Sequence, residues 1–290
     1  MTIPQLSCYR HADRGAGVSC QRCDRPICPD CMISASVGFH CPNCARSNAQ
    51  RVVKPSARWS NNQTMVRPVA TLVIIAINVA VFMFDYTQRN SVLFERFALI
   101  GYGNYRDIGE IGVAQGEWWR LVTGGFLHGG AMHLAFNMFA LWSLGQIMEQ
   151  VLGSVRFAAA YMASLLAGSF GVMVLSPNDI TVGASGAVFG LFGLLLMLQL
   201  SRSIPLRQTG LGLTLALNLG ITFVIPNISI GGHLGGLAGG AVIGLSLFGL
   251  PRSARQPNAA VGWAVIAAVA VVATIGAVAL ASRPPIFGGG

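Results

Sequence analysis

Seven long apolar segments after residue 67 decide what this chain can fold into. A helix needs about 20 mostly apolar residues to cross the hydrocarbon core of a bilayer. In this chain 53% of the residues are hydrophobic and only 10% are charged. We therefore predict an all-α polytopic membrane protein, with spans at 69–85, 132–152, 156–175, 183–200, 209–224, 230–250 and 261–281.

The arginines in the short connections between these spans predict the orientation of the chain. Alternate connections are basic and contain Arg156, Arg202, Arg207, Arg252 and Arg255, whereas 176–182 and 225–229 contain no basic residue. Basic short loops tend to stay in the cytoplasm. We therefore expect a plasma-membrane protein with a cytoplasmic N-terminus and its C-terminus outside. The net charge of +9 then reflects orientation, and nucleic acid is not an expected partner.

Two features of the sequence bear on the source of the chain and its targeting. Arginine is far more frequent than lysine, and Lys54 is the only lysine, which is typical of a GC-rich bacterial genome. Residues 1–10 are polar and lead directly into a cysteine cluster, so we expect no cleavable signal peptide.

Before the first span, seven cysteines and one histidine form four pairs with two residues between the members of each pair. An odd number of cysteines argues against a disulfide framework. Eight ligands fill two tetrahedral zinc sites, and a cytoplasmic location keeps the thiols reduced. Redox chemistry is the alternative use of these cysteines. The pairs are Cys8 and His11, Cys20 and Cys23, Cys28 and Cys31, and Cys41 and Cys44.

The alternation of short and long gaps between the pairs resembles a cross-braced zinc finger of the B-box type. This resemblance implies that the first and third pairs (Cys8, His11, Cys28, Cys31) bind one zinc ion and that the second and fourth pairs (Cys20, Cys23, Cys41, Cys44) bind the other. Such a small domain cannot build a core, so the metal would supply its folding energy. We expect the domains 1–45 (finger), 46–67 (linker), 68–250 (six-helix core) and 251–290 (an extra transmembrane helix and a short tail).

Ser185 and His233 are polar residues inside apolar, glycine-rich spans. Residues 183–190 read GASGAVFG, and residues 231–236 read GGHLGG. A serine in such a setting can be a small packing residue that bonds back to its own helix. A buried intramembrane histidine, by contrast, is expensive and tends to be functional. Serine with histidine as its base forms a nucleophilic pair.

The predicted spans place four polar residues at a similar depth near the outer surface. Ser185, His233, His133 and Asn137 all lie within about two helical turns of that boundary. Glycines every four residues from Gly232 to Gly244 would let another helix approach closely. Ser185 would also stand at a helix N-terminus, where backbone N–H groups, the Asn137 amide and His133 could stabilise an oxyanion. Because no acidic third member is evident, we predict a Ser–His dyad.

Taken together, these residues and their neighbours resemble the motifs of the rhomboid family of intramembrane serine proteases. The resemblance covers about residues 66–250 and implies a six-helix core with Ser185 and His233 catalytic and His133 and Asn137 at the oxyanion. Phe189 stands where relatives often carry tyrosine. The matching motifs are Gly183-x-Ser185-Gly186, Gly232-His233-x2-Gly236-x3-Gly240, His133-x3-Asn137, Trp119-Arg120 and Gly145-x3-Glu149-x3-Gly153.

Three functions compete on this evidence. The first is an intramembrane endopeptidase that cuts single-pass membrane proteins within or near the outer end of their transmembrane helix. The second is an inactive rhomboid-like protein that binds membrane clients, and such proteins usually lack the Ser or His that this chain has. The third is a transporter, which the position of the polar residues close to one face disfavours. A cytoplasmic protein partner for the finger stays open.

Overall fold

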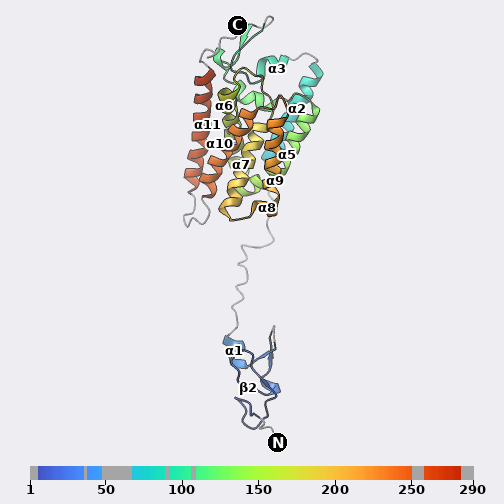
Figure 1. Ribbon diagram of the computed structural model, residues 1–290, viewed down its shortest axis with the longest axis vertical. Coiled ribbons are helices and arrows are strands. Elements are labelled where there is room, and N and C mark those ends of the chain that lie inside the picture. Colours follow the sequence, from blue (N-terminus) through green and yellow to red (C-terminus); the bar gives the residue numbers. More distant parts are fainter. Residues whose placement is uncertain are drawn as a thin grey trace. The chain divides into compact units, whose positions relative to one another are not determined.

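The computed structural model describes residues 6–35, 38–47, 67–88, 92–105, 109–249 and 258–281. Within it the chain forms two compact units, Met1–Thr64 and Met65–Gly290 (Figure 1). Most of the predicted linker at 46–67 and the tail after residue 281 lie outside the described residues.

The N-terminal unit is built from very short elements. Strand β1 (Val18–Ser19) pairs with β2 (Pro26–Ile27), and β3 (Ile33–Ser34) pairs with β4 (Phe39–His40), both antiparallel. A 3₁₀ turn, η1 (Pro29–Cys31), and helix α1 (Pro42–Ser47) complete the unit. The prediction of an all-α protein was therefore wrong in detail: the chain is mostly helical, with short hairpins.

Cysteine makes up most of the buried core of this unit. Ile27 is the only fully buried aliphatic side chain among the described residues of the cluster, which otherwise consists of cysteines. A single isoleucine buries far too little apolar surface to offset the entropy of ordering this chain. Tyr9, Met32 and Phe39 are only partly buried against this cluster, so cysteines supply most of its fully buried side chains.

The second unit is a helical bundle whose long helices match the predicted spans. All seven predicted spans correspond to helices, which end within a few residues of the expected positions. Arg156, placed in a connection by the sequence, lies in the first turn of α6. The helices are α2 (Val69–Gln88), α5 (Ala131–Leu152), α6 (Ser154–Leu175), α7 (Ser185–Ser201), α9 (Leu211–Val224), α10 (Ile230–Phe248) and α11 (Ala259–Ala281), with the short α8 (Leu206–Thr209) before α9.

Four of the described helices are long and apolar enough to cross a bilayer by themselves: α2, α6, α10 and α11. Helices α7 and α9 are apolar but shorter, with 17 and 14 residues. The chain is a multi-pass integral membrane protein.

Helices α6, α7 and α10 meet through glycine at the centre of the bundle (Figure 1). A Cβ atom on Gly236 of α10 would lie 1.9 Å from the Gly186 carbonyl oxygen of α7, and one on Gly240 would lie 2.0 Å from the Gly190 oxygen. A Cβ on Gly171 of α6 would lie 2.1 Å from the Gly231 oxygen. Only glycine permits backbones to approach this closely.

The outer helices differ in how firmly they are packed. Helix α11 lies against α6 and α10 (Figure 1), where the Arg156 guanidinium stands over the Trp263 ring at 5.6 Å from its centroid. Helix α9 is much less covered. Its only buried residues are Leu211 at the start and Thr222 near the end.

The segment between α2 and α5 forms a folded cap. It contains α3 (Val92–Phe97), the hairpin β5 (Gly103–Tyr105) and β6 (Gly109–Ile111), η3 (Val113–Gln115), α4 (Arg120–Thr123) and η4 (Gly124–Phe126). Leu99, just after α3, pairs by a β-bridge with Thr181, just before α7. The cap is thus attached to the chain that leads into Ser185.

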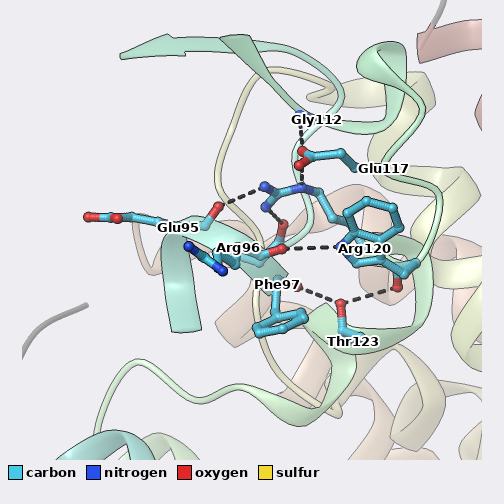
Figure 2. A network of polar contacts seen from close by, with 9 residues as sticks. Glu95, Arg96, Phe97, Gly112, Glu117, Arg120 and Thr123 are labelled. Atoms are coloured by element: carbon cyan, nitrogen blue, oxygen red, sulfur yellow. Dashed lines mark hydrogen bonds and ion pairs between the residues drawn. The ribbon is translucent and has the colours of Figure 1, made fainter. Parts of the chain in front are cut away.

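Arg120 holds this cap together rather than anchoring it at the membrane surface (Figure 2). The side chain is only 1% exposed. Its Nε donates to Glu117 Oε2 at 2.7 Å, and its two other nitrogens donate to the carbonyls of Ala98 at 2.8 Å and Glu95 at 2.7 Å. Of the Trp119-Arg120 motif, the arginine is therefore a buried structural residue, whereas Trp119 and the neighbouring Trp118 are exposed.

Candidate functional site

Ser185 is the first residue of α7, and a turn at Gly183 leads into the helix. Gly183 has φ +121°, a conformation that L side chains rarely adopt, and its N–H donates to the Gly124 carbonyl at 2.9 Å. The residue before the helix, Ala184, provides no side-chain cap. The backbone N–H groups of the first turn are therefore left without a side-chain partner next to the Ser185 hydroxyl.

His233 lies in the first turn of α10 and is 8% exposed. The Ser229 hydroxyl caps this helix by accepting from the Gly232 N–H at 3.1 Å. The imidazole stacks on the Phe189 ring of α7, with ring centroids 4.0 Å apart and planes at 16°. Phe189, which stands where relatives often carry tyrosine, thus packs against the histidine ring.

The same stack brings His233 to the face of α7 that carries Ser185. Ser185 and Phe189 are four residues apart and share one helix face, and the backbones at Gly186 and Gly236 meet directly beneath them. In the part of the chain that the structure describes, the two side chains make no direct hydrogen bond. Catalytic contacts of this kind are often longer without substrate.

A small recess opens beside the serine. Its volume is about 30 Å³, which is room for roughly one or two water molecules. Residues from the cap, α6, the turn before α7 and the start of α10 line it, among them Gly124, Ser169, Thr181, Ser185, Ser229 and Gly232. The Ser185 side chain therefore lines a small, mainly apolar recess that also contains the hydroxyls of Ser169, Thr181 and Ser229.

His133 of α5 lies next to the Gly183 turn, and Asn137 lies one turn later on the same helix. A Cβ on Gly183 would lie 2.8 Å from both Cε1 and Nε2 of His133 and 3.8 Å from the Ser185 hydroxyl oxygen. The Asn137 amide donates one N–H to the His133 carbonyl at 2.9 Å. The amide has a second N–H, so it can also serve a bound group.

Two residues near the site were missed by the sequence reasoning. The Thr222 hydroxyl of α9 lies 2.7 Å from His233 Nδ1. His128 is 3% exposed and its ring centroid lies 5.1 Å from that of His133. Among the described residues neither ring nitrogen of His128 has a hydrogen-bond partner. The signal for Thr222 was available, because it is a polar residue near the end of an apolar span.

Glu149, from the Gly145-x3-Glu149-x3-Gly153 motif, lies at the opposite end of α5 and has a structural role. It is 0% exposed, and its two oxygens accept the Ala70 and Thr71 N–H groups at 2.8 Å each. The Thr71 and Ser154 hydroxyls also donate to it, at 2.7 and 2.6 Å. The carboxylate thus caps the N-terminus of α2, whose first N–H groups would otherwise be unpaired in the membrane.

In the N-terminal unit the side chains gather in two tetrads, one for each predicted group. One contains Cys8, His11, Cys28 and Cys31, and the other contains Cys20, Cys23, Cys41 and Cys44. Within each tetrad the ligand atoms all lie within 4.8 Å of one another, and the described cysteines are free thiols. His40 belongs to neither tetrad.

The distances within the tetrads fit a tetrahedral ion. His11 Nδ1 lies 3.4 Å from the Sγ atoms of both Cys28 and Cys31, and the Sγ atoms of Cys23 and Cys41 are 3.8 Å apart. A tetrahedron with Zn–S bonds of about 2.3 Å has S–S edges of about 3.8 Å. The arrangement therefore matches the donor set that zinc prefers.

The clustered thiol groups of the tetrads also favour a bound cation. Burial raises the pKa of Cys8, but N–H donors from Arg10, Cys28 and His11 outweigh it and lower the pKa to about 6. Burial and the neighbouring Cys8 and Cys28 instead raise the pKa of Cys31 to about 11. The three thiolates of this tetrad, and the four of the other, repel one another at such short range unless a positive ion compensates their charge.

Comparison with known proteins agrees with this geometry. The Rhomboid domain family matches residues 115–250. Over 144 residues the chain is 46% identical to "Rhomboid protease GluP" of Bacillus subtilis, and over 174 residues it is 38% identical to "Putative rhomboid protease YdcA" of the same organism. It is also 34% identical over 176 residues to "RHOMBOID-like protein 4" of Arabidopsis thaliana.

The extent of these matches differs between the relatives. They cover 49% of this chain and 28% of GluP, and 59% of this chain and 44% of the Arabidopsis protein. The match to YdcA covers 59% of this chain and 84% of that relative. With 38% identity over most of the length of a rhomboid relative, and with a serine turn and a histidine helix joined through glycine, the chain belongs to the rhomboid family.

Proposed function

We propose that this chain is an intramembrane serine endopeptidase, with Ser185 as the nucleophile and His233 as its general base. The observation that carries this proposal is the stack of the His233 ring on Phe189, one helical turn after Ser185. It brings a base to the helix face that presents the Ser185 hydroxyl to a small recess with room for water. Membership of a family whose named members are proteases supports the same reading.

The reaction proceeds by acyl transfer. The Ser185 oxygen attacks the carbonyl carbon of the scissile bond while His233 takes the hydroxyl proton, and the protonated imidazole then donates that proton to the leaving amine. A water molecule from the recess next gives a proton to His233 and attacks the acyl-enzyme. The bond to Ser185 breaks, the serine recovers its proton, and the peptide acid leaves.

Negative charge on the carbonyl oxygen is stabilised by donors around Gly183. The free N–H groups at the start of α7 point the positive end of the helix dipole at this place. His133, in contact with Gly183, and the second N–H of Asn137 are the side-chain donors. Loss of one such donor typically costs about 100- to 1,000-fold in rate, so Asn137→Ala should keep trace activity.

The substrates we propose are single-pass membrane proteins, cut within or near the outer end of their transmembrane helix. An intact helix hides its carbonyls in hydrogen bonds. The cut region should therefore contain small or helix-breaking residues. Mass spectrometry of the product termini checks this expectation, and cuts mainly at the cytoplasmic end of the substrate helix would contradict it.

For topology we propose a cytoplasmic N-terminus and an external C-terminus, with a core at 68–250 and α11 as an added span. We further propose that the tetrads hold two structural zinc ions. Zinc would fix the folded shape of residues 1–45 and take no part in peptide cleavage. Metal analysis of the purified chain should return about two equivalents of zinc.

Cleavage assays on purified variants test the protease proposal directly. Ser185→Ala and His233→Ala should each reduce cleavage of a panel of single-pass proteins to background, a loss on the order of 10⁶-fold in soluble serine proteases. Ser201→Ala is the matched control, because this hydroxyl ends the same helix and only bonds back to the Leu198 carbonyl at 2.8 Å.

The client-binding alternative predicts a different result. Ser185→Ala with normal expression and full cleavage would show that the serine is not the nucleophile. Stable capture of intact substrates by the wild-type chain, without products, would favour a binding function instead.

A further inference from the structure

Thr222 links the loosely packed helix α9 to the histidine of the proposed dyad. Its hydroxyl oxygen lies 2.7 Å from His233 Nδ1 and 2.8 Å from the Asn218 carbonyl oxygen one turn earlier on α9. The side chain is 1% exposed. Resting on the protease function proposed above, we infer that Thr222 is a positioning residue that holds the His233 proton on Nδ1 and leaves Nε2 as the basic nitrogen.

The positions of the hydrogen atoms follow from counting donors. A threonine hydroxyl has one proton, and a carbonyl oxygen can only accept. The short contact to Asn218 is therefore satisfied when the hydroxyl donates to that carbonyl. Its oxygen is then an acceptor toward His233, so Nδ1 carries the hydrogen. A neutral imidazole with hydrogen on Nδ1 has its free lone pair on Nε2.

This tautomer is the one that a general base needs. The nitrogen that removes the serine proton must be unprotonated before attack, and a hydrogen bond at the other nitrogen decides which of the two it is. Serine proteases of the triad type use a carboxylate for this purpose. Thr222 is neutral, so it can orient the ring and choose the tautomer but gives little charge stabilisation to the imidazolium.

Thr222 and Phe189 restrain the same ring in different ways. Phe189 of α7 covers one face of the imidazole, with the planes at 16°. Thr222 of α9 fixes rotation within that plane through Nδ1. The base is therefore aligned by three helices, α7, α9 and α10. Thr222 is one of only two buried residues on α9. The tautomer and orientation of His233 therefore depend on α9 keeping Thr222 packed against the imidazole.

The experiment has two readouts, a rate and a tautomer. We would measure kcat and KM for Thr222→Val, which keeps the branched shape and removes the hydroxyl, and for Thr222→Ser, which restores a hydroxyl. Thr214→Val is the control, because Thr214 lies on the same helix and only bonds back to the Gly210 carbonyl at 3.1 Å. Loss of the hydrogen-bond partner that orients a metal-bound histidine typically costs about 10- to 100-fold, and we expect an effect of this size for the neutral Thr222.

The tautomer is read by ¹⁵N NMR of histidine-labelled protein in detergent micelles, at about pH 8 where imidazole is neutral. The chain has five histidines, and the His233 signals are those that disappear in His233→Ala. Wild-type and Thr222→Ser proteins should show a protonated Nδ1 and an unprotonated Nε2. Thr222→Val should lose this preference, with kcat lowered about 10- to 100-fold and KM changed little.

The inference is overturned if the wild-type spectrum shows hydrogen on Nε2, or if Thr222→Val keeps both tautomer and kcat. A Thr222→Val protein that does not fold leaves the wild-type and Thr222→Ser results to decide. The tautomer does not depend on turnover and can be recorded in Ser185→Ala. Hydrogen on Nδ1 in a wild-type protein that cleaves nothing would reject the protease function alone, whereas cleavage with hydrogen on Nε2 would reject the role of Thr222 alone.

Discussion

The N-terminal unit and the helical unit of this chain bring polar side chains together by opposite means. In the first, eight ligands from a short stretch of sequence surround two small spaces, and a single isoleucine accompanies the cysteines in the core. In the second, residues about 50 positions apart, Ser185 and His233, approach because glycines at Gly186 and Gly236 allow their helices to touch.

The comparison teaches where each unit is vulnerable. Removing the bound cation from the first unit would leave a cluster of mutually repelling thiolates with almost no apolar core. Removing one polar group from the helical unit leaves the apolar contacts intact, whereas adding a single carbon at a glycine contact does not. Four predictions sharpen this contrast, from the largest expected effect to the smallest.

Removal of bound metal by a chelator should produce the largest difference in stability between the two units. Structural zinc contributes roughly 10–16 kcal/mol to the folding of small fingers. A strong chelator should therefore unfold residues 1–45, observed as a loss of protease resistance in that region. The thermal midpoint of the helical unit should stay the same. If chelation instead lowers that midpoint by many degrees, the helical unit also depends on the metal.

A methyl group at the α7–α10 contact should destabilise the helical unit strongly. In Gly236→Ala the new Cβ would lie 1.9 Å from the Gly186 carbonyl oxygen, so the helices must move apart. We expect a loss of about 3 kcal/mol, together with loss of cleavage as Ser185 and His233 separate. Gly220→Ala is the control, since nothing lies within 4 Å of that position. Equal thermal midpoints for the two variants in detergent would contradict the close approach.

Removing the charge of Glu149 should cost less and should affect stability rather than chemistry. In Glu149→Gln an amide NH₂ replaces one acceptor among four donors, which leaves buried groups unpaired at a cost of about 1–3 kcal/mol. Glu110→Gln, at an exposed site on β6, is the control. Thermal unfolding and the rate per folded molecule, measured on the same samples, should show a lower midpoint and a nearly unchanged rate. A strongly reduced rate at full stability would give Glu149 a role in catalysis.

The smallest effect is expected at His40. It lies next to Cys41 but belongs to neither tetrad, so His40→Ala should keep both zinc equivalents. His11→Ala should lose one of them, because His11 Nδ1 lies 3.4 Å from two sulfurs of its tetrad. Metal analysis of the two variants compares them directly. Loss of zinc in His40→Ala would require a different set of ligands.

Much of the architecture was predictable because it depends on local pattern. Apolar length located the seven long helices, the spacing of the cysteine pairs indicated two metal sites, and the resemblance to a cross-braced finger implied which pairs form each tetrad. The folded cap was not predicted, because its short elements have no strong periodicity and depend on buried contacts such as those of Arg120. Glycine spacing indicated close packing on α10, but the contribution of Gly171 on α6 was not evident from it.

The sequence by itself determined which residues were available for chemistry: a serine after a glycine turn, a histidine among glycines, and eight metal-ligand side chains. It did so because residue type and spacing are properties of the chain alone. Only the tertiary structure decided which partners these groups have. The Thr222 hydroxyl contacts His233 Nδ1. The His128 ring lies beside the His133 ring, and its nitrogens have no hydrogen-bond partner among the described residues. Helix rotation and tilt fix such contacts, and these follow from packing against neighbouring helices rather than from hydropathy.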